Sequence, residues 1–369
     1  MKEDRLSMIE VAGQPFDMGY QHGSELKDVV GVSLETFRRL IVADVYGLVP
    51  AGVRGPSFEE VVDLAAEAIP LTEEYAPEVV EEMRGVAEGS GSKFEEIFAL
   101  NSHLDILERI GSHGGRLEPS GGCSSYAVSN GATADGDTYV GWNADEGEDW
   151  LRSMVLIKAR PAEEPPLMFW NFAGCIGRPG MNPYLGLSAN GLFASDSWLG
   201  VPYCVICRKI LQQRSVEDAI VVISGVRRMA GLNYTLGDVE GNVAAVETTA
   251  RRSVVIPGVN GKVVHTNMYV TDELIPLEMA KGDDLVNSQR RLERLRELIV
   301  EREAGSITLE DLKAVHRDHA NRPDSICAHG DDKYPGQMTL TSMIIQPSRE
   351  RMLVAYGHPC EHEFVEYTL

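Results

Sequence analysis

Two patterns of hydrophobic and polar residues divide the chain near residue 122. Before it, apolar residues recur at helical spacing in four segments, residues 24–47, 57–75, 76–91 and 93–111. Ser57 opens the second segment and Glu60 follows three residues later, which is the spacing of a capping box. Pro77 stands early in the third segment and glycines end it, as is common in helices. The N-terminal third is therefore predicted to be mostly helical.

After Cys123 short alternating runs dominate, which is the pattern of strands. Turn pairs such as Asn130-Gly131 and Asn190-Gly191 separate them. Strands are expected at 124–129, 138–142, 153–160, 167–174, 184–190 and 191–198, with hairpins at 233–249, 253–267 and 337–359. Helices are expected at about 203–213, 215–225, 286–303 and 308–319. Helices in runs and strands in runs predict a layered α+β fold with mostly antiparallel pairing. No linker interrupts the chain, so residues 1–369 are expected to form one unit.

Composition narrows the functional classes. The net charge of −22 argues against binding to nucleic acid, because phosphates would be repelled. The N-terminus has no apolar signal segment, and no run approaches the roughly 18 apolar residues of a membrane span. A cytoplasmic protein without membrane contact is expected. Six cysteines are too few for a disulfide scaffold, so free thiols are expected.

Cys123 is the first candidate for chemistry. Gly121 and Gly122 precede it and free the backbone, while Ser124 and Ser125 place hydroxyls beside the thiol. A thiol is a ready nucleophile, but it must be deprotonated by a base or a positive neighbour. The alternative is a buried cysteine that packs like a small apolar residue.

A metal or nucleotide site is not expected. Cys204 and Cys207 form a Cys-x-x-Cys pair on a predicted helix, but a zinc site needs two further ligands and none stands at a suitable spacing. Ordinary packing is favoured for both. The chain has no phosphate-binding loop and no Gly-x-Gly-x-x-Gly motif after a strand.

Polar residues at two strand ends are candidate partners of the thiol. Asn143 and Asp145 end the second strand of the hairpin that Cys123 opens, so they should return toward the cysteine. His265 and Asn267 follow an apolar strand and could line an active site. The alternatives are a loop-capping aspartate and a structural histidine.

Motifs in a set order run through nearly the whole chain. They are GQPFDMGYQHG (13–23), the segment 76–101, GGCSS (121–125), GWNAD (141–145), GLSANG (186–191), the segment 231–247, HTNMY (265–269), RPDSIC (322–327) and MLVAYGHPC (352–360). This set resembles the acyl-CoA:6-aminopenicillanic acid acyltransferase family of N-terminal-nucleophile (Ntn) cysteine hydrolases, similar in logic to bile salt hydrolase and penicillin V acylase. The resemblance implies a four-layer αββα sandwich with two stacked antiparallel sheets.

The resemblance also implies self-cleavage between Gly122 and Cys123. The fragments 1–122 and 123–369 would stay associated without a covalent bond. Cys123 would then be the N-terminal residue of the larger fragment, with its own α-amine as the base for its thiol.

Further roles are implied residue by residue. Asp145 would anchor the freed amine, with Asn143 as the neighbouring amide of the same motif, and Asn267 would stabilise the oxyanion. The family arginine that follows the SIC motif is replaced here by Ala328. Either another cation, such as Arg178 or Arg322, substitutes for it, or the substrate differs. The candidate substrate-binding residues are Ser124, Tyr126, Arg178 and His265.

The activity implied is an amidohydrolase or acyltransferase that acts on a small N-acylated amine, amino acid or peptide through a thioester. No bound cofactor or metal is implied, although acyl-CoA would be a cosubstrate of a transferase. A homo-oligomer is expected only because homo-oligomers are common among soluble proteins. Two alternatives stay open. One is a non-catalytic Ntn-fold protein that binds a small acyl or peptide ligand, and the other is a cysteine peptidase that uses His265 without self-cleavage.

Overall fold

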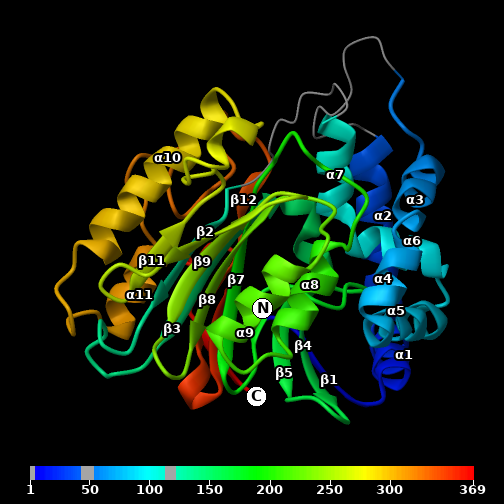
Figure 1. The fold of residues 1–369 in the computed structure, drawn as a ribbon, viewed down its shortest axis with the longest axis horizontal. Helices are drawn as coiled ribbons and strands as arrows, with labels where there is room; N and C mark the ends of the chain where they lie inside the picture. Colours follow the sequence, from blue (N-terminus) through cyan, green and yellow to red (C-terminus); the bar gives the residue numbers. More distant parts are fainter. Residues whose placement is uncertain (1–4, 43–53, 113–121) are drawn as a thin grey trace.

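The computed structural model describes residues 5–42, 54–112 and 122–369 (Figure 1). Its strands form two sheets. The larger has the order β1-β4-β5-β6-β7-β8-β9-β10 and the smaller the order β11-β2-β3-β12-β13-β14. The strands are β1 (Met8–Gly13), β2 (Ser124–Val128), β3 (Tyr139–Gly147), β4 (Met154–Pro161), β5 (Leu167–Phe172), β6 (Gly180–Met181), β7 (Leu185–Gly191), β8 (Leu232–Asp238), β9 (Val243–Thr248), β10 (Ser253–Pro257), β11 (Lys262–His265), β12 (Gln337–Gln346), β13 (Arg351–Tyr356) and β14 (Val365–Thr368).

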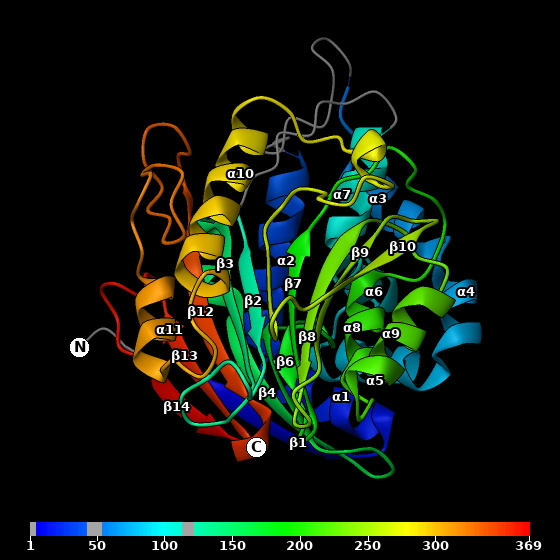
Figure 2. The same cartoon turned by 60° about the vertical axis from the view of Figure 1, so that its left-hand side comes forward.

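Helices cover the outer face of each sheet. Those of the described segments are α1 (Pro15–Glu25), α2 (Lys27–Val42), α3 (Phe58–Ala66), α4 (Ile69–Tyr75), α5 (Pro77–Ser90), α6 (Phe94–Asn101), α7 (His103–Ser112), α8 (Tyr203–Ile210), α9 (Val216–Gly225), α10 (Asp283–Leu295) and α11 (Leu309–His316). Helices α10 and α11 lie on the smaller sheet, and α1 to α9 lie on the side of the larger one (Figures 1 and 2). The two sheets pack on each other between these layers. The predicted α+β class and the αββα order of layers are confirmed.

The strand pattern after Cys123 is largely as predicted, but the hairpin expected at 253–267 is wrong, because β10 pairs with β9 in the larger sheet and β11 pairs with β2 in the smaller one. Strand β1 in the N-terminal part was not predicted. Strand β1, from the N-terminal part, pairs with β4 in parallel, whereas the other pairs among the described strands are antiparallel. The strand expected at 191–198 is wrong: beyond Gly191 the segment makes only an isolated bridge between Ala194 and Glu278. The N-terminal part therefore supplies both a helical layer and an edge strand of the larger sheet.

The predicted helices exist, but two of them are divided. The capping box of Ser57 and Glu60 is present at the start of α3. The segment 57–75 divides into α3 and α4, and the segment 93–111 divides into α6 and α7. Part of the first predicted helix, residues 43–47, lies outside the described residues.

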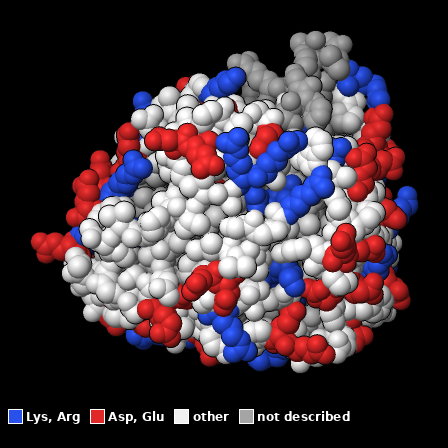
Figure 3. All heavy atoms as spheres, viewed as in Figure 1, with Lys and Arg blue, Asp and Glu red and all other residues white. Residues whose placement is uncertain are grey.

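The surface agrees with a chain that carries excess negative charge. On the face drawn in Figure 3, acidic side chains are spread around most of the outline, and a group of Lys and Arg side chains lies near its upper centre. Among the described residues, none of the helices is both long enough and apolar enough to cross a membrane.

Helices α1 and α5 approach each other through glycines. A Cβ atom on Gly19 would lie 1.9 Å from the carbonyl oxygen of Glu82, and one on Gly85 would lie 2.2 Å from that of Phe16. Neither position can hold a side chain unless the two backbones separate. This close contact joins two helices of the outer layer.

We expect Gly19→Ala to lower the free energy of unfolding by about 1–3 kcal/mol or more, because the added methyl group overpacks a backbone contact. Gly31→Ala is the matched control, since a Cβ there meets nothing within 4 Å. Alanine at this exposed position of α2 should stabilise the helix by about 0.5–1 kcal/mol. Urea unfolding of both variants measures the difference, and equal effects would contradict the close-contact interpretation.

Candidate active site

Cys123 immediately precedes β2 and is 8% exposed. In the smaller sheet Ser124 lies opposite Asn143 of β3, and Ser125 lies opposite His265 of β11. The start of β2 is therefore flanked by the end of β3 and the end of β11. The hairpin register predicted from the sequence, which returns residues 143–145 toward the cysteine, is confirmed.

The two serines after Cys123 fasten β2 on opposite faces. Ser125 donates to Asn190 Oδ1 at 2.6 Å and lies 3.0 Å from Thr235 Oγ1, both on the larger sheet. Ser124 faces α10, where its hydroxyl accepts from Arg291 Nη1 at 3.1 Å. These contacts hold the cysteine between the sheets.

The Cys123 thiol is not a ready thiolate in the intact chain. Burial, together with the negative charges of Asp145 and Glu146, raises its pKa to about 12. The backbone amide of Asp145 and the Arg291 guanidinium act in the opposite direction. At neutral pH the thiol is therefore protonated, and it needs a base before it can act as a nucleophile.

Asp145 lies beside this thiol with half of its carboxylate unsatisfied. Its Oδ1 accepts from Thr339 Oγ1 at 2.6 Å. Its Oδ2 is buried and has no hydrogen-bond partner among the described residues. Burial raises the pKa of Asp145 to about 8, although the charge of Arg291 and the hydrogen bond from Thr339 oppose the shift. Buried polar atoms are usually paired, so this oxygen is available to a further hydrogen-bond partner.

Arg291 supplies the positive charge of the site. Its Nη1 donates to the Cys123 carbonyl oxygen at 2.7 Å, and its Nη2 donates to Asn267 Oδ1 at 3.3 Å. Its Nε donates to Asn287 Oδ1 at 2.7 Å. A Cβ atom on Gly122 would lie 2.8 Å from Nη2 of this arginine. Glycine before the cysteine therefore leaves the space that the guanidinium fills.

Sequence reasoning missed Arg291, although the sequence contains a signal. The residue lies on α10 with the buried stripe of Ser288, Leu292 and Leu295, and it is itself 1% exposed. An arginine at a core position of an amphipathic helix must find partners, because unpaired buried charge is costly.

The RPDSIC motif anchors α10 over the site. The buried carboxylate of Asp324 accepts from Arg290 at 2.6 Å and from Asn287 at 3.2 Å. It also accepts from Tyr334 at 2.8 Å and from Lys333 at 3.0 Å. Asn287 in turn holds Arg291, so the motif orients the guanidinium indirectly.

A pocket opens beside Gly122, Asp145, Asn267 and Arg291. Its other walls come from α10 and from the segment after α11, with Asp284, Asn287, Ser288, Pro323, Ser325, Ala328, His329, Gly330, Asp331, Tyr334, Gln337 and Ala280. Asn267 Nδ2 donates to the Gly191 carbonyl oxygen at 3.0 Å, which leaves its second hydrogen for another acceptor. Three of the sequence candidates, Gly122, Asp145 and Asn267, therefore share this pocket.

Asn143 and Tyr126 are held elsewhere. Asn143 Oδ1 accepts from Ser342 Oγ at 2.6 Å and lies 2.5 Å from His316 Nδ1, while its Nδ2 donates to the carbonyl oxygens of His316 and Ile326. The Tyr126 hydroxyl lies 2.9 Å from His316 Nε2. Burial lowers the pKa of His316 to about 3, so its neutral ring accepts from Tyr126 and donates to Asn143. Both residues fasten α11 to the sheet.

Both ring nitrogens of His265 are engaged by groups other than the thiol. Its Nε2 lies 2.9 Å from Glu247 Oε1 and its Nδ1 lies 2.7 Å from the Thr266 carbonyl oxygen. Burial opposes ionisation of Glu247, but hydrogen bonds from His265, Thr271 and Val270 lower its pKa overall. Because both ring nitrogens are engaged, this geometry does not support a peptidase in which His265 is the base for Cys123.

The two arginines considered as substitutes for the family arginine are also placed elsewhere. Arg178 donates from Nη2 to Glu146 at 2.7 Å and packs over the rings of Trp170 and Phe172. Arg322 is exposed. The cation that contacts the backbone of Cys123 is Arg291 instead.

Similar proteins include an acyltransferase and a protein of Dictyostelium discoideum. The acyl-coenzyme A:6-aminopenicillanic-acid-acyltransferase 40 kDa form of Emericella nidulans is 23% identical over 366 residues, which cover 95% of this chain and 92% of that protein. Protein dcd1B of Dictyostelium discoideum is 23% identical over 268 residues, which cover 66% of this chain and 50% of that protein.

Two solved structures are also similar to part of the chain. A mutant of the conjugated bile acid hydrolase of Clostridium perfringens shares 14% identity, with a TM-score of 0.45, over 67% of this chain and 97% of that chain. Penicillin V acylase of Agrobacterium tumefaciens shares 12% identity, with a TM-score of 0.37, over 63% of this chain and 82% of that chain.

The family profile described as acyl-coenzyme A:6-aminopenicillanic acid acyl-transferase matches residues 132–361, which is more than half of the chain. The resemblance predicted from the ordered motifs is confirmed by this match, and the chain belongs to the acyl-coenzyme A:6-aminopenicillanic acid acyl-transferase family.

Proposed function

We propose that the chain cleaves itself before Cys123 and then acts as an N-terminal-cysteine amidohydrolase or acyltransferase on a small N-acylated amine, amino acid or peptide. One observation carries this proposal. Beside the thiol, the buried carboxylate of Asp145 has an oxygen without a hydrogen-bond donor in the described part of the chain. An α-ammonium group at Cys123 would supply that donor.

Self-cleavage begins at the peptide bond between Gly122 and Cys123. The thiol sulfur attacks the Gly122 carbonyl carbon, the C–N bond breaks, and the proton lost by the thiol is transferred to the leaving nitrogen, which becomes a free amine. Water then hydrolyses the thioester and leaves a carboxylate on Gly122. The hydrogen bond from Arg291 to the Cys123 carbonyl oxygen, which belongs to the next peptide unit, would hold the main chain on the C-terminal side of the scissile bond during the attack.

The freed amine would change the chemistry of the thiol. An α-amine titrates near ~8 and a thiol near ~8.5, so a proton can pass between them at neutral pH. Asp145 would hold the ammonium form through its free oxygen and orient it toward the sulfur. The base that the buried thiol lacks in the intact chain would thereby be supplied by the chain itself.

Turnover would use the same sulfur on an acyl carbonyl of the substrate. The amine takes the thiol proton, the carbonyl oxygen becomes an oxyanion, and Asn267 Nδ2 donates its second hydrogen to it. One such donor stabilises the transition state by about 2.7–4 kcal/mol in comparable enzymes. The substrate nitrogen leaves with the proton and the acyl group stays on Cys123 as a thioester. Water completes hydrolysis, whereas a second amine completes transfer. If acyl-CoA is the acyl donor, the CoA thiol takes the proton and leaves in place of the substrate nitrogen.

The fragments 1–122 and 123–369 would remain together after cleavage. Strand β1 of the first fragment pairs with β4 of the second over Met8–Gly13. The Asp105 carboxylate on α7 accepts from the backbone N–H of Tyr203 at the start of α8. These steps need no bound cofactor.

We expect denaturing mass spectrometry of the purified chain to give two fragments, the larger one beginning at Cys123. Cys123→Ala should give one intact chain, and Asp145→Asn should retain or slow cleavage but lower turnover. Cys207→Ala is the control for removing a different buried thiol, and its chain should still be cut. A wild-type chain that stays intact under all conditions would contradict the proposal.

The acyl-enzyme should be trapped on Cys123 by members of a panel of N-acyl amino acids, peptides, β-lactams and acyl-CoAs. Asn267→Ala should lower kcat about 10²–10³-fold for the substrate so identified, because one oxyanion donor is lost. Loss of activity in the His265→Ala variant alone, with Asn267→Ala fully active, would favour the peptidase alternative instead.

The pH dependence of stability tests the environment of Asp145. Since its pKa is raised from 3.8 to about 8, the folded chain binds this proton more tightly than the unfolded chain. This contribution to stability is complete below about pH 4 and is lost as the pH rises through about 8. In the uncleaved Cys123→Ala background, Asp145→Asn should remove that loss, a difference on the order of 6 kcal/mol at pH 9. Urea unfolding from pH 4 to 9 measures it, and parallel curves would show that Asp145 does not carry a raised pKa.

A further inference from the structure

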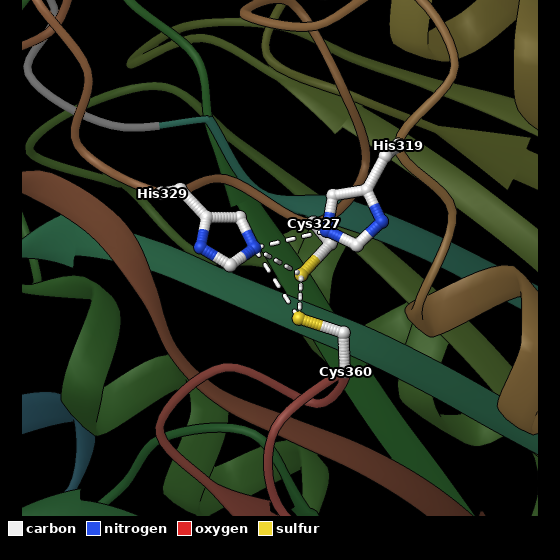
Figure 4. A group of neighbouring side chains, drawn as sticks. All are labelled: His319, Cys327, His329 and Cys360. Atoms are coloured by element: carbon white, nitrogen blue, oxygen red, sulfur yellow. Dashed lines mark hydrogen bonds between the residues drawn. The ribbon is translucent and has the colours of Figure 1, made fainter.

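Four side chains of metal-binding type converge beside the candidate active site, whose pocket one of them, His329, also lines. They are His319, Cys327, His329 and Cys360, and their donor atoms all lie within 4.8 Å of one another. Figure 4 shows the two sulfur atoms and the imidazole rings pointing toward a common point. The residues come from the segment after α11 and from the turn between β13 and β14.

The distances between the donor atoms fit a tetrahedral zinc ion. With Zn–S of about 2.3 Å and Zn–N of about 2.0–2.1 Å, tetrahedral geometry separates two sulfurs by about 3.8 Å and a sulfur from a nitrogen by about 3.5 Å. Here the Cys327 and Cys360 sulfurs are 3.7 Å apart, and His329 Nε2 lies 3.5 Å and 3.3 Å from them. The Nε2 atoms of His319 and His329 are 2.9 Å apart, so they would separate by a few tenths of an ångström.

The surroundings of His329 also suit a metal ligand. A metal-bound histidine commonly directs its second ring nitrogen toward a carboxylate, which fixes the orientation of the ring. The far nitrogen of His329, Nδ1, lies 4.0 Å from Glu361 Oε1, and the ring of His358 stacks on it at 4.0 Å. The ring is thus supported on the side away from the two thiols.

We propose that His319, Cys327, His329 and Cys360 bind one structural zinc ion. Two thiolates and two imidazoles complete the tetrahedral coordination of zinc, and no position is left for a substrate or water. Binding would release the thiol protons to solvent, with no change of oxidation state. No metal was expected from the sequence, because the Cys204–Cys207 pair has no further ligands at a suitable spacing. That pair is fully buried in α8.

The ion would brace one wall of the candidate active site. Ala328, between two of the ligands, lines the pocket, and its backbone N–H donates to Thr339 Oγ1 at 2.9 Å. Thr339 in turn donates to Asp145 Oδ1. The zinc site would therefore tie the turn that holds Cys360 to the backbone that positions Asp145.

The test uses the full chain. After incubation with ZnSO₄ and desalting, elemental analysis should find about one zinc per chain, and Cys360→Ser and His329→Gln should each lose it. Cys123→Ala is the matched control, because it removes a thiol outside the set and should retain the metal whether or not the chain is cleaved. The zinc result and the self-cleavage result can therefore fail independently.

Cobalt gives a second measurement that does not depend on variants. Co²⁺ added to the wild-type chain should produce the visible absorption of tetrahedral cobalt and a thiolate-to-cobalt charge-transfer band.

Glu361→Gln should weaken metal affinity about 10–100-fold while leaving one site per chain. Two outcomes would overturn the proposal. One is a chain that binds neither metal although all six thiols react under denaturing conditions, and the other is a Cys327–Cys360 disulfide in the freshly purified protein.

Discussion

One buried guanidinium organises the start of β2. Arg291 reaches from α10 across the face of the smaller sheet and bonds the Cys123 carbonyl oxygen, the Ser124 hydroxyl and Asn267. A charged group at 1% exposure is tolerated only if its donors are satisfied, and here backbone, hydroxyl and amide oxygens satisfy them. The same contacts align the residue before the strand with the ends of β3 and β11. The geometry of the candidate site therefore depends on the docking of one helix.

The sequence predicted the parts of the site that follow from strand counting. A hairpin that begins at Cys123 must return near Asp145, and a strand that ends at His265 places Asn267 at the same edge. These are local consequences of alternation and turn position. The αββα layers came from the family resemblance, since periodicity alone indicates only α+β.

The parts that sequence reasoning missed depend on packing between distant segments. Arg291 belongs to a charged helix whose docked face is not evident without the sheet beneath it. Asn143 and Asp145 lie two positions apart on β3, yet α11 covers the first while the second reaches the pocket. The donors His319 and Cys360 are separated along the chain by strands β12 and β13. In each case the role of a residue depends on which helix or strand covers it, and the local sequence pattern does not show this.

The parallel pairing of β1 with β4 has a consequence for a chain that is cut after residue 122. Strand β1 is the outermost strand of the larger sheet, so its partner would become a bare edge if the shorter piece departed. Bare edges recruit other strands and promote aggregation. The cut protein would thus behave as an obligate pair of polypeptides. Its resistance to unfolding would depend on protein concentration, as in a dimer, although it began as one chain.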